Sequence, residues 1–297
     1  MKILLFGKDG QVGWELQRSL APLGELVAMG RREADLETPD GLRDCVRRHQ
    51  PDIIVNAAAY TAVDKAESEP ERARAANALA PGVLAQEAKD LDAWLVHYST
   101  DYVFDGSGDR PWRETDPAGP LNVYGATKLE GEQLIRQAGC RHLIFRTSWV
   151  FGTRGGNFAK TMLRLAQERD TLSVVNDQIG APTGADLLAD ITAHAVRTAR
   201  HRPEVSGLYH LAAAGATSWC GYAQYVLELA QERGIALKVA PGQVRPVPTE
   251  AYPAPARRPK NSRLDTVKFA ETFDLRLPEW QYHVRRLMDE LIAQGAS

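Results

Sequence analysis

The first twenty residues constrain the fold more than any other segment of the chain. Residues 3–6 are the apolar run Ile-Leu-Leu-Phe, which is typical of a buried parallel strand. Gly7, Gly10 and Gly13 follow at once, and an amphipathic stretch begins at Trp14. In a strand, glycine turn and helix of this kind, the backbone can approach a pyrophosphate and the helix amino terminus can bind it. The spacing G-x-x-G-x-x-G departs from the usual G-x-G-x-x-G, so its place after the first strand is what favours a dinucleotide site.

Strand and helix patterns alternate through the first half of the chain, which predicts β-α-β units and a parallel sheet. The expected strands are residues 3–6, 25–29, 52–56, 93–98 and 142–147, and the expected helices lie near 12–20, 41–49, 71–89 and 124–137. We therefore predict an α/β fold, a Rossmann-type doubly wound parallel sheet, with a dinucleotide-binding domain over residues 1–150.

The pattern changes from about residue 180 onward. Helices are expected over 185–200, 218–233 and 279–294, with a short strand over 207–211. The proline-rich stretch 241–259 predicts an ordered, irregular loop. We interpret residues 151–297 mainly as a smaller, mixed substrate-binding lobe, some of whose segments return to the first domain. Ligands should bind in the crevice at the carboxyl ends of the strands.

The composition is that of an ordinary soluble globular protein. The chain has 297 residues, of which 44% are hydrophobic and 25% charged, with a net charge of −2. This balance gives no basic footprint for nucleic acid. No run approaches the ~18 apolar residues of a membrane span, and no secretory signal precedes the first strand. The three cysteines have no metal-like spacing and predict free thiols in a reducing cytoplasm.

Tyr124 and Lys128 carry the clearest chemical signal. They lie four apart in a predicted helix and so project from the same face. We expect the ammonium to favour the phenolate and to lower the pKa of Tyr124 below its usual value near ~10. Such pairs are also common on surface helices, but here Ser99 and Thr100 end a predicted strand upstream. A hydroxyl there can hold a carbonyl before the phenol, as reduction of a ketone requires.

Only one of Ser99 and Thr100 can face a substrate, because strand neighbours point to opposite sides. The sequence does not decide between them, and we choose Thr100. The small residues 56–59, Asn-Ala-Ala-Ala, follow another strand and let a cofactor lie against the backbone, the alternative being plain tight packing.

Arg31 and Arg32 follow the second predicted strand. An acid there would bind a ribose 2′-hydroxyl, whereas an arginine would accommodate a 2′-phosphate. Gly30 takes the place of the acid, which favours use of NADPH, and the alternative is a solvated basic turn. Asp35 is a candidate contact for the adenine.

A second basic cluster, Arg257, Arg258 and Arg263, lies in a loop near the carboxyl terminus. Guanidinium groups bind phosphate in a bidentate manner, so a nucleotide-linked substrate would favour Arg258, against a solvated loop as the alternative. The histidines lack metal-ligand spacing, and we interpret the following as structural or surface residues: His97, His194, His201 and His210.

With these motifs in place, the chain resembles the extended short-chain dehydrogenase/reductase family, and within it the reductases that complete dTDP-L-rhamnose synthesis. The matching strings are residues 3–8, 10–16, 55–64, 97–104, 120–125, 145–150, 157–160, 176–178, 180–183, 258–259 and 261–264. They cover essentially the whole chain. Several lie outside the cofactor half, so the resemblance is more specific than the fold.

The resemblance implies reduction of a dTDP-linked 4-keto-6-deoxy sugar at C4 by NADPH or NADH. It implies that Thr100 positions the ketone, Tyr124 gives the proton, and Lys128 holds the nicotinamide ribose. With the residues discussed above, the expected cofactor contacts are Gly7, Gly10, Gln11, Val12, Gly13, Arg31, Asp35, Leu36, Ala58, Ala59, Tyr60, Thr61, Tyr98, Tyr124 and Lys128. The expected substrate contacts are Thr100, Asp101, Trp149, Asn157 and Arg258.

The resemblance also bears on assembly. Members of the family can be homodimers with a magnesium ion at the interface, held by acidic side chains. Glu15 matches one such position, and Asp186 and Glu290 could supply others, although Asp186 stands where a glutamate is expected.

Two alternative functions stay open at this point. One is a sugar-nucleotide 4,6-dehydratase or epimerase that recycles a tightly held NAD. Dehydratases of this fold carry an Asp-Glu pair after the threonine, whereas here Asp101 is followed by Tyr102. The other is a non-catalytic regulatory subunit of the same fold, against which the complete set of Thr100, Tyr124 and Lys128 argues.

Overall fold

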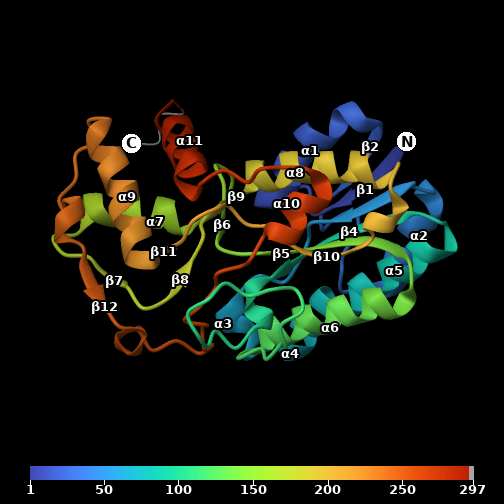
Figure 1. The fold of residues 1–297 in the computed structure, drawn as a ribbon, viewed down its shortest axis with the longest axis horizontal. Helices are drawn as coiled ribbons and strands as arrows, with labels where there is room; N and C mark the ends of the chain where they lie inside the picture. The colour runs from blue at the N-terminus through green and yellow to red at the C-terminus, as the bar shows by residue number, and fades with distance from the viewer. Residues whose placement is uncertain (294–297) are drawn as a thin grey trace.

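A six-stranded parallel sheet forms the centre of the protein (Figure 1). The computed structural model describes residues 1–293. The sheet order is β10-β5-β4-β3-β1-β2. Strand β2 is added on one side of β1 and the later strands on the other side, as in a doubly wound fold. The strands are β1 Lys2–Phe6, β2 Glu25–Met29, β3 Ile53–Asn56, β4 Trp94–Thr100, β5 Arg141–Thr147 and β10 Gly207–His210. The predicted fold class is confirmed.

Helices cover both faces of the sheet, because successive residues of its strands are buried on opposite sides. In β1, Ile3 and Leu5 belong to one buried cluster, while Leu4 and Phe6 belong to another. The first cluster includes α1 Gln11–Leu20 and α8 Ala185–Ala199; the second includes α2 Pro39–His49, α5 Ala80–Asp90 and α6 Val123–Ala138. Figure 1 shows these two helical layers on either side of the strands.

The helix predicted over residues 71–89 is not regular. It consists of α4 Pro70–Arg74, a π-helical turn Ala75–Leu79, and α5. The turn carries the buried Asn77, whose amide accepts a hydrogen bond from the Tyr60 N–H at 2.8 Å and donates one to the Tyr60 carbonyl at 3.1 Å. Such turns often accompany functional sites. Here the turn fixes the loop after β3.

The smaller part of the molecule holds helices with short strand pairs. Its helices are α7 Phe158–Glu168, α9 Trp219–Glu232 and α11 Trp280–Ala293. Its strand pairs are β6 Val150–Phe151 with β9 Thr183–Gly184, β7 Ser173–Val175 with β12 Arg245–Val247, and β8 Ile179–Gly180 with β11 Thr217–Ser218. The remaining short elements are α3 Val63–Ala66, α10 Val267–Phe273 and the 3₁₀ turns Ala21–Leu23, Asp101–Val103 and Pro203–Val205.

One expectation for this part changes, and the end of another lies beyond the described residues. The stretch 241–259 is not irregular throughout, because β12 pairs with β7 and flanking 3₁₀ turns form at Pro241–Gln243 and Thr249–Ala251. The last predicted helix reaches Gln294, which lies outside the described residues. Two later segments, α8 and β10, pack on or join the central sheet. Over the described residues, no helix is long and apolar enough to cross a membrane.

Candidate active site

A cavity of about 690 Å³ lies at the carboxyl ends of the central strands, where the sheet changes winding direction. The predicted site residues that line it are Gly7, Gly10, Gln11, Val12, Arg31, Asp35, Leu36, Ala58, Ala59, Tyr60, Thr61, Tyr98, Thr100, Asp101, Tyr124, Lys128 and Trp149. The cavity therefore joins the glycine turn to the Thr-Tyr-Lys set.

Three predicted contacts do not line this cavity. Gly13 lies behind the glycine turn, where a Cβ would come within 2.0 Å of the Gly7 carbonyl oxygen, so its role is to let α1 close on β1. Asn157 caps α7, accepting from the Lys160 N–H at 3.1 Å. Arg258 lines a second cavity, described below.

Thr100 and Ser99 end β4 and point to different partners. The Ser99 hydroxyl donates to the carboxylate of Glu132, which is buried beneath the sheet edge. The Thr100 hydroxyl contacts the Tyr124 phenol and lies 3.1 Å from Asp101 Oδ1. Of the two hydroxyls, that of Thr100 is the one beside the phenol.

The expected lowering of the Tyr124 pKa is wrong. Burial raises the pKa of Tyr124 to about 12, and this effect outweighs the opposing contact from Thr100. The amine of Lys128 contacts the Tyr98 carbonyl at 2.6 Å and His97 Nε2 at 3.1 Å. Burial also lowers the pKa of Lys128 to about 8, against an opposing effect of Glu132. Desolvation is thus the largest cause of both pKa shifts.

His97 lies behind the cavity without lining it, so its interpretation as a structural residue stands, and the structure adds a contact with Lys128. Only 1% of His97 is exposed, and its ring joins Lys128 to Asn56, whose Nδ2 lies 3.2 Å from His97 Nδ1. The signal was present in the sequence. His97 and Ser99 alternate with Tyr98 and Thr100 along the strand, so they share the face that α6 covers.

Asp101 presents a buried carboxyl to the cavity. Burial raises its pKa to about 7, while the hydroxyls of Ser262 and Thr100 oppose the shift. Its Oδ2 has no hydrogen-bond partner among the described residues. A buried polar atom left in this state suits a ligand hydroxyl.

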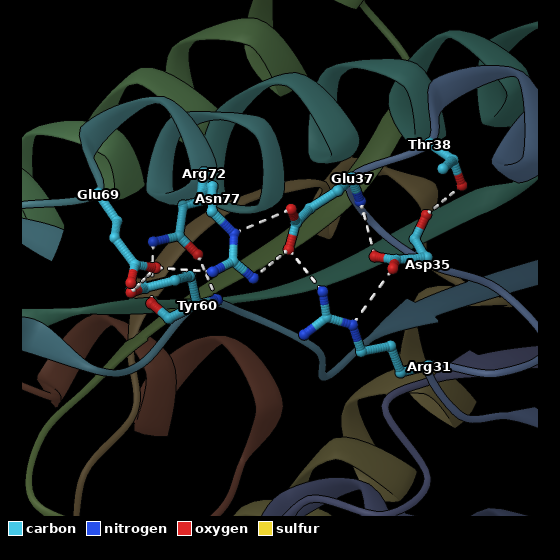
Figure 2. Close-up of polar contacts among 8 residues, drawn as sticks. All are labelled: Arg31, Asp35, Glu37, Thr38, Tyr60, Glu69, Arg72 and Asn77. Atoms are coloured by element: carbon cyan, nitrogen blue, oxygen red, sulfur yellow. Dashed lines mark hydrogen bonds and ion pairs between the residues drawn. The ribbon is translucent and has the colours of Figure 1, made fainter. Parts of the chain in front are cut away.

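Arg31 stands at the far rim of the cavity, where its guanidinium is already engaged (Figure 2). It donates to Glu37 at 2.7 Å and to Asp35 at 3.2 Å. Arg72 shares Glu37 with it and also binds Glu69, so two arginines lie on either side of one carboxylate. Arg31 is thus an exposed turn residue whose guanidinium is already paired with carboxylates, rather than a free phosphate ligand.

Gly30 stands after β2 where an acid is expected, and another residue, Asp9, brings a carboxylate to that place. A Cβ built on Gly30 would lie 2.3 Å from Asp9 Oδ2, so the carboxylate of Asp9 occupies the space of a side chain at that position. Asp9 belongs to the glycine turn and lines the cavity beside Arg31. Sequence reasoning missed it because nothing in the local pattern brings the turn to the end of β2.

A second cavity of about 880 Å³ lies in the smaller part of the molecule. Phe158, Arg257 and Arg258 line it, and Trp219 lines both cavities. Trp219 stacks on Trp149, with ring centroids 3.6 Å apart and planes at 13°. Trp149 itself has φ +47°, a conformation uncommon for a bulky residue and frequent at functional sites.

The expected metal ligands do not form a cation site as they are arranged. Asp186 Oδ2 lies 2.9 Å from His283 Nδ1 and 3.3 Å from Arg286, and Arg286 also binds Glu290 at 3.0 Å. Glu15 is paired with Arg18. Among residues 1–293, no group of three His, Cys, Asp or Glu is placed to hold a metal ion. These carboxylates are neutralised by basic side chains, so we derive no step that involves magnesium.

Comparisons with known proteins agree with this geometry. The profile of the family described as RmlD substrate binding domain matches residues 1–293. The chain is 58% identical to dTDP-4-dehydrorhamnose reductase of Escherichia coli K12 over all of both chains.

Solved structures give the same result. A crystal structure of dTDP-4-dehydrorhamnose reductase from Bacillus anthracis in complex with NADP has a TM-score of 0.87 and 34% identity, covering 97% of this chain and 99% of that one. The crystal structure of the orthologue from Clostridium acetobutylicum has a TM-score of 0.89 and 34% sequence identity. The match covers 98% of this chain and 100% of that one. The chain therefore belongs to the RmlD family, whose curated relatives include the dTDP-4-dehydrorhamnose reductases.

Proposed function

We propose that this protein is an NAD(P)H-dependent dTDP-4-dehydrorhamnose reductase. It would reduce dTDP-6-deoxy-L-lyxo-4-hexulose to dTDP-L-rhamnose, the last step of dTDP-rhamnose synthesis. One observation carries the proposal: Thr100, Tyr124 and Lys128 line a cavity that continues to the glycine turn. The full-length identity to a reductase of that name supports the choice of substrate.

The buried residues suit the donation of a proton. Tyr124 is a neutral phenol at physiological pH, because burial raises its pKa to about 12. A bound nicotinamide cofactor supplies the hydride. Thr100 holds the C4 carbonyl, and Tyr124 gives its proton to the oxygen as negative charge develops there. Removal of one such donor typically costs ~10²–10³ in rate.

The nucleotide part of the substrate fits the second cavity. Trp219 connects the two cavities and offers a flat apolar surface. Arg258 lines this second cavity, where its guanidinium now donates to Asp64. Turned toward the substrate, it would provide a planar, bidentate donor suited to a diphosphate. Asp101, with its unpaired Oδ2, would then contact a sugar hydroxyl.

We propose that both NADPH and NADH are accepted, since Asp9 can bind ribose hydroxyls while Arg31 can turn to a 2′-phosphate. The homodimer and the cytoplasmic location stay predictions.

The geometry gives no support to a dehydratase. The position after Asp101 holds Tyr102, whose ring packs edge-on against Tyr124 at 5.7 Å between centroids. No carboxylate is available there for the second proton transfer that dehydration requires.

The decisive experiment measures cofactor oxidation by purified protein with dTDP-6-deoxy-L-lyxo-4-hexulose, using NADPH and NADH in turn. Tyr124→Phe should lose about 10²–10³ in kcat while keeping the fold. Tyr225→Phe, on α9 and outside both cavities, is the matched control. Absence of oxidation in wild-type protein that still binds the cofactors would refute the proposal.

A further inference from the structure

Three buried polar side chains form a row beneath the active site. Asn56 ends β3, His97 lies in β4, and Lys128 projects from α6. Each is at most 2% exposed. Asn56 Nδ2 lies 3.2 Å from His97 Nδ1, and His97 Nε2 lies 3.1 Å from Lys128 Nζ. The row therefore connects a neutral amide to a proposed catalytic lysine.

The direction of each hydrogen bond in this row follows from one backbone group. The Ala58 N–H can only donate, and it lies 3.2 Å from Asn56 Oδ1, which must be the amide oxygen. The amide nitrogen therefore faces His97, and it can only donate. His97 Nδ1 must accept, so a neutral imidazole carries its proton on Nε2.

The Nε2–H group then points at Lys128. An ammonium has three donors and no lone pair, so it would oppose this N–H. An uncharged amine accepts from Nε2–H and still donates to the Tyr98 carbonyl at 2.6 Å. Burial acts in the same direction, since it lowers the pKa of Lys128 to about 8 and that of His97 well below its ordinary value.

The other charged groups nearby do not cancel this preference. Glu132, one turn further along α6, favours the ammonium. Its carboxylate is bound, however, by Arg146 of β5 at 2.6 and 2.9 Å and by the Ser99 hydroxyl of β4. Asp101 and Tyr124 face each other on the cavity side of the row.

We propose that Asn56 and His97 are positioning residues that control the protonation of Lys128, and that the tautomer imposed on His97 sets the alkaline limit of reduction. The inference rests on the proposed function. When Tyr124 gives its proton to the substrate oxygen, its O–H bond breaks and a phenolate remains. The phenolate must regain a proton before the next turnover. In this proposal Lys128, which lines the same cavity, returns that proton as the ammonium, and solvent then reprotonates the amine. Where Lys128 is an amine it has no such proton to return, so kcat should fall on the alkaline side.

Two substitutions reverse the tautomer effect. In Asn56→Asp, one carboxylate oxygen keeps the Ala58 N–H and the other accepts from Nδ1–H, so Nε2 becomes an acceptor for the ammonium. The negative charge of the new aspartate also favours the ammonium form of Lys128. We therefore expect the alkaline limb of the kcat profile to shift to higher pH by about 1–3 units. His97→Gln adds no charge, and its amide oxygen can accept from the ammonium, so this variant isolates the hydrogen-bond effect.

The kinetic test measures kcat and kcat/KM from pH 6 to 10 at saturating cofactor. His142→Gln, at the opposite end of β5, is the matched control and should leave the profile unchanged. A merely structural role would lower kcat equally at every pH. If the alkaline limb stays in place in both folded variants, the proposal is overturned.

A spectroscopic test needs no substrate and so separates this inference from the proposed function. In ¹⁵N-labelled wild-type protein, with and without NADP⁺, His97 should show an unprotonated Nδ1 and a protonated Nε2. The Nζ of Lys128 should titrate below an ordinary lysine in wild type and higher in His97→Gln. A proton on Nδ1, or an ordinary Lys128 titration, would overturn the inference even if a variant failed to fold.

Discussion

At the scale of single residues, burial decides the chemistry of the site. Asp101, Tyr124 and Lys128 each have a pKa shifted toward the neutral form, with desolvation as the largest cause. A neutral phenol is the form that gives a proton, so the shift of Tyr124 suits reduction. The same burial gives Asp101 a measurable effect on stability.

Asp101→Asn should become more stabilising as the pH rises. Burial raises the pKa of Asp101 from near 4 in an unfolded chain to about 7. The folded state therefore retains the proton, and wild-type stability declines between these values by roughly 1.4 kcal/mol per pH unit. An amide has no such dependence. Urea unfolding at pH 4.5, 6 and 8 measures the difference between the variant and wild type.

The exposed Asp105 provides the control for that experiment. Hydrogen bonds from Ser107 hold the pKa of Asp105 below its usual range, so this carboxyl is ionised in both the folded and the unfolded state over these pH values, and the effect of Asp105→Asn should stay nearly constant. If the advantage of Asp101→Asn did not grow with pH, burial of its charge would not be the cause.

Arg31 should distinguish the two cofactors. In NADPH, the 2′-phosphate would draw its guanidinium away from Asp35 and Glu37. Loss of a charge-assisted hydrogen bond costs about 1.5–3 kcal/mol, so Arg31→Ala should raise the KM for NADPH roughly ten- to hundredfold. The KM for NADH should change little. Steady-state kinetics with each cofactor provide the measurement.

Arg32→Ala is the matched control for Arg31→Ala, because Arg32 is exposed and does not line either cavity. An equal loss with NADPH and NADH in Arg31→Ala would mean that Arg31 only supports the adenosine end of the site.

At the scale of elements, the contact between β1 and α1 depends on Gly13. A Cβ there would lie 2.0 Å from the Gly7 carbonyl oxygen and 2.6 Å from its carbon. Both are backbone atoms of Gly7, which directly follows β1 and donates its N–H to the Met29 carbonyl at 2.9 Å. Gly13→Ala should lower the free energy of unfolding by about 1–3 kcal/mol and weaken cofactor binding. Urea unfolding and cofactor titration test the two effects.

Gly242→Ala is the comparison, since nothing lies within 4 Å of its added Cβ. Its stability should stay within about 1 kcal/mol of wild type. A similar loss in both variants would indicate that backbone freedom, rather than the close approach, is what matters at Gly13.

The helix α6 shows what an element contributes to catalysis. Tyr124, Lys128 and Glu132 recur every four residues and so share one face. Asn122 caps the helix by accepting from the Gly125 N–H at 2.8 Å, which fixes where this face begins. The four-residue spacing of these side chains could be predicted from the sequence. Their partners, His97 and Arg146, come from two different strands and could not be predicted from it.

At the scale of the molecule, one ion pair connects the loop after β12 to helix α3, which follows β3 in the chain. Arg258, which lines the second cavity, donates two hydrogen bonds to Asp64 of α3, at 3.1 and 2.8 Å. Arg258→Ala should raise the KM for the sugar nucleotide at least about tenfold, as expected for loss of a bidentate phosphate contact. Cofactor affinity, measured by fluorescence titration, should not change.

Arg257→Ala controls for that result, because Arg257 lines the same cavity but is exposed. If its effect equalled that of Arg258→Ala, general positive charge, rather than a specific contact, would account for the binding of the diphosphate.

The sequence by itself determined the local features. The strand, glycine turn and helix at the amino terminus, the alternation of elements and the Tyr124–Lys128 spacing all follow from periodicities of the chain. These were enough to predict the parallel sheet and the edge of the sheet at which the cavity lies.

The tertiary structure decided the rest, because desolvation and partner choice depend on what packs around each group. Burial reversed the expected shift of the Tyr124 pKa. Close packing brought Asp9 into the space beside Gly30 and joined Asn56, His97 and Lys128 in one row. These residues are far apart in the sequence, and no local pattern encodes the contact of one with another.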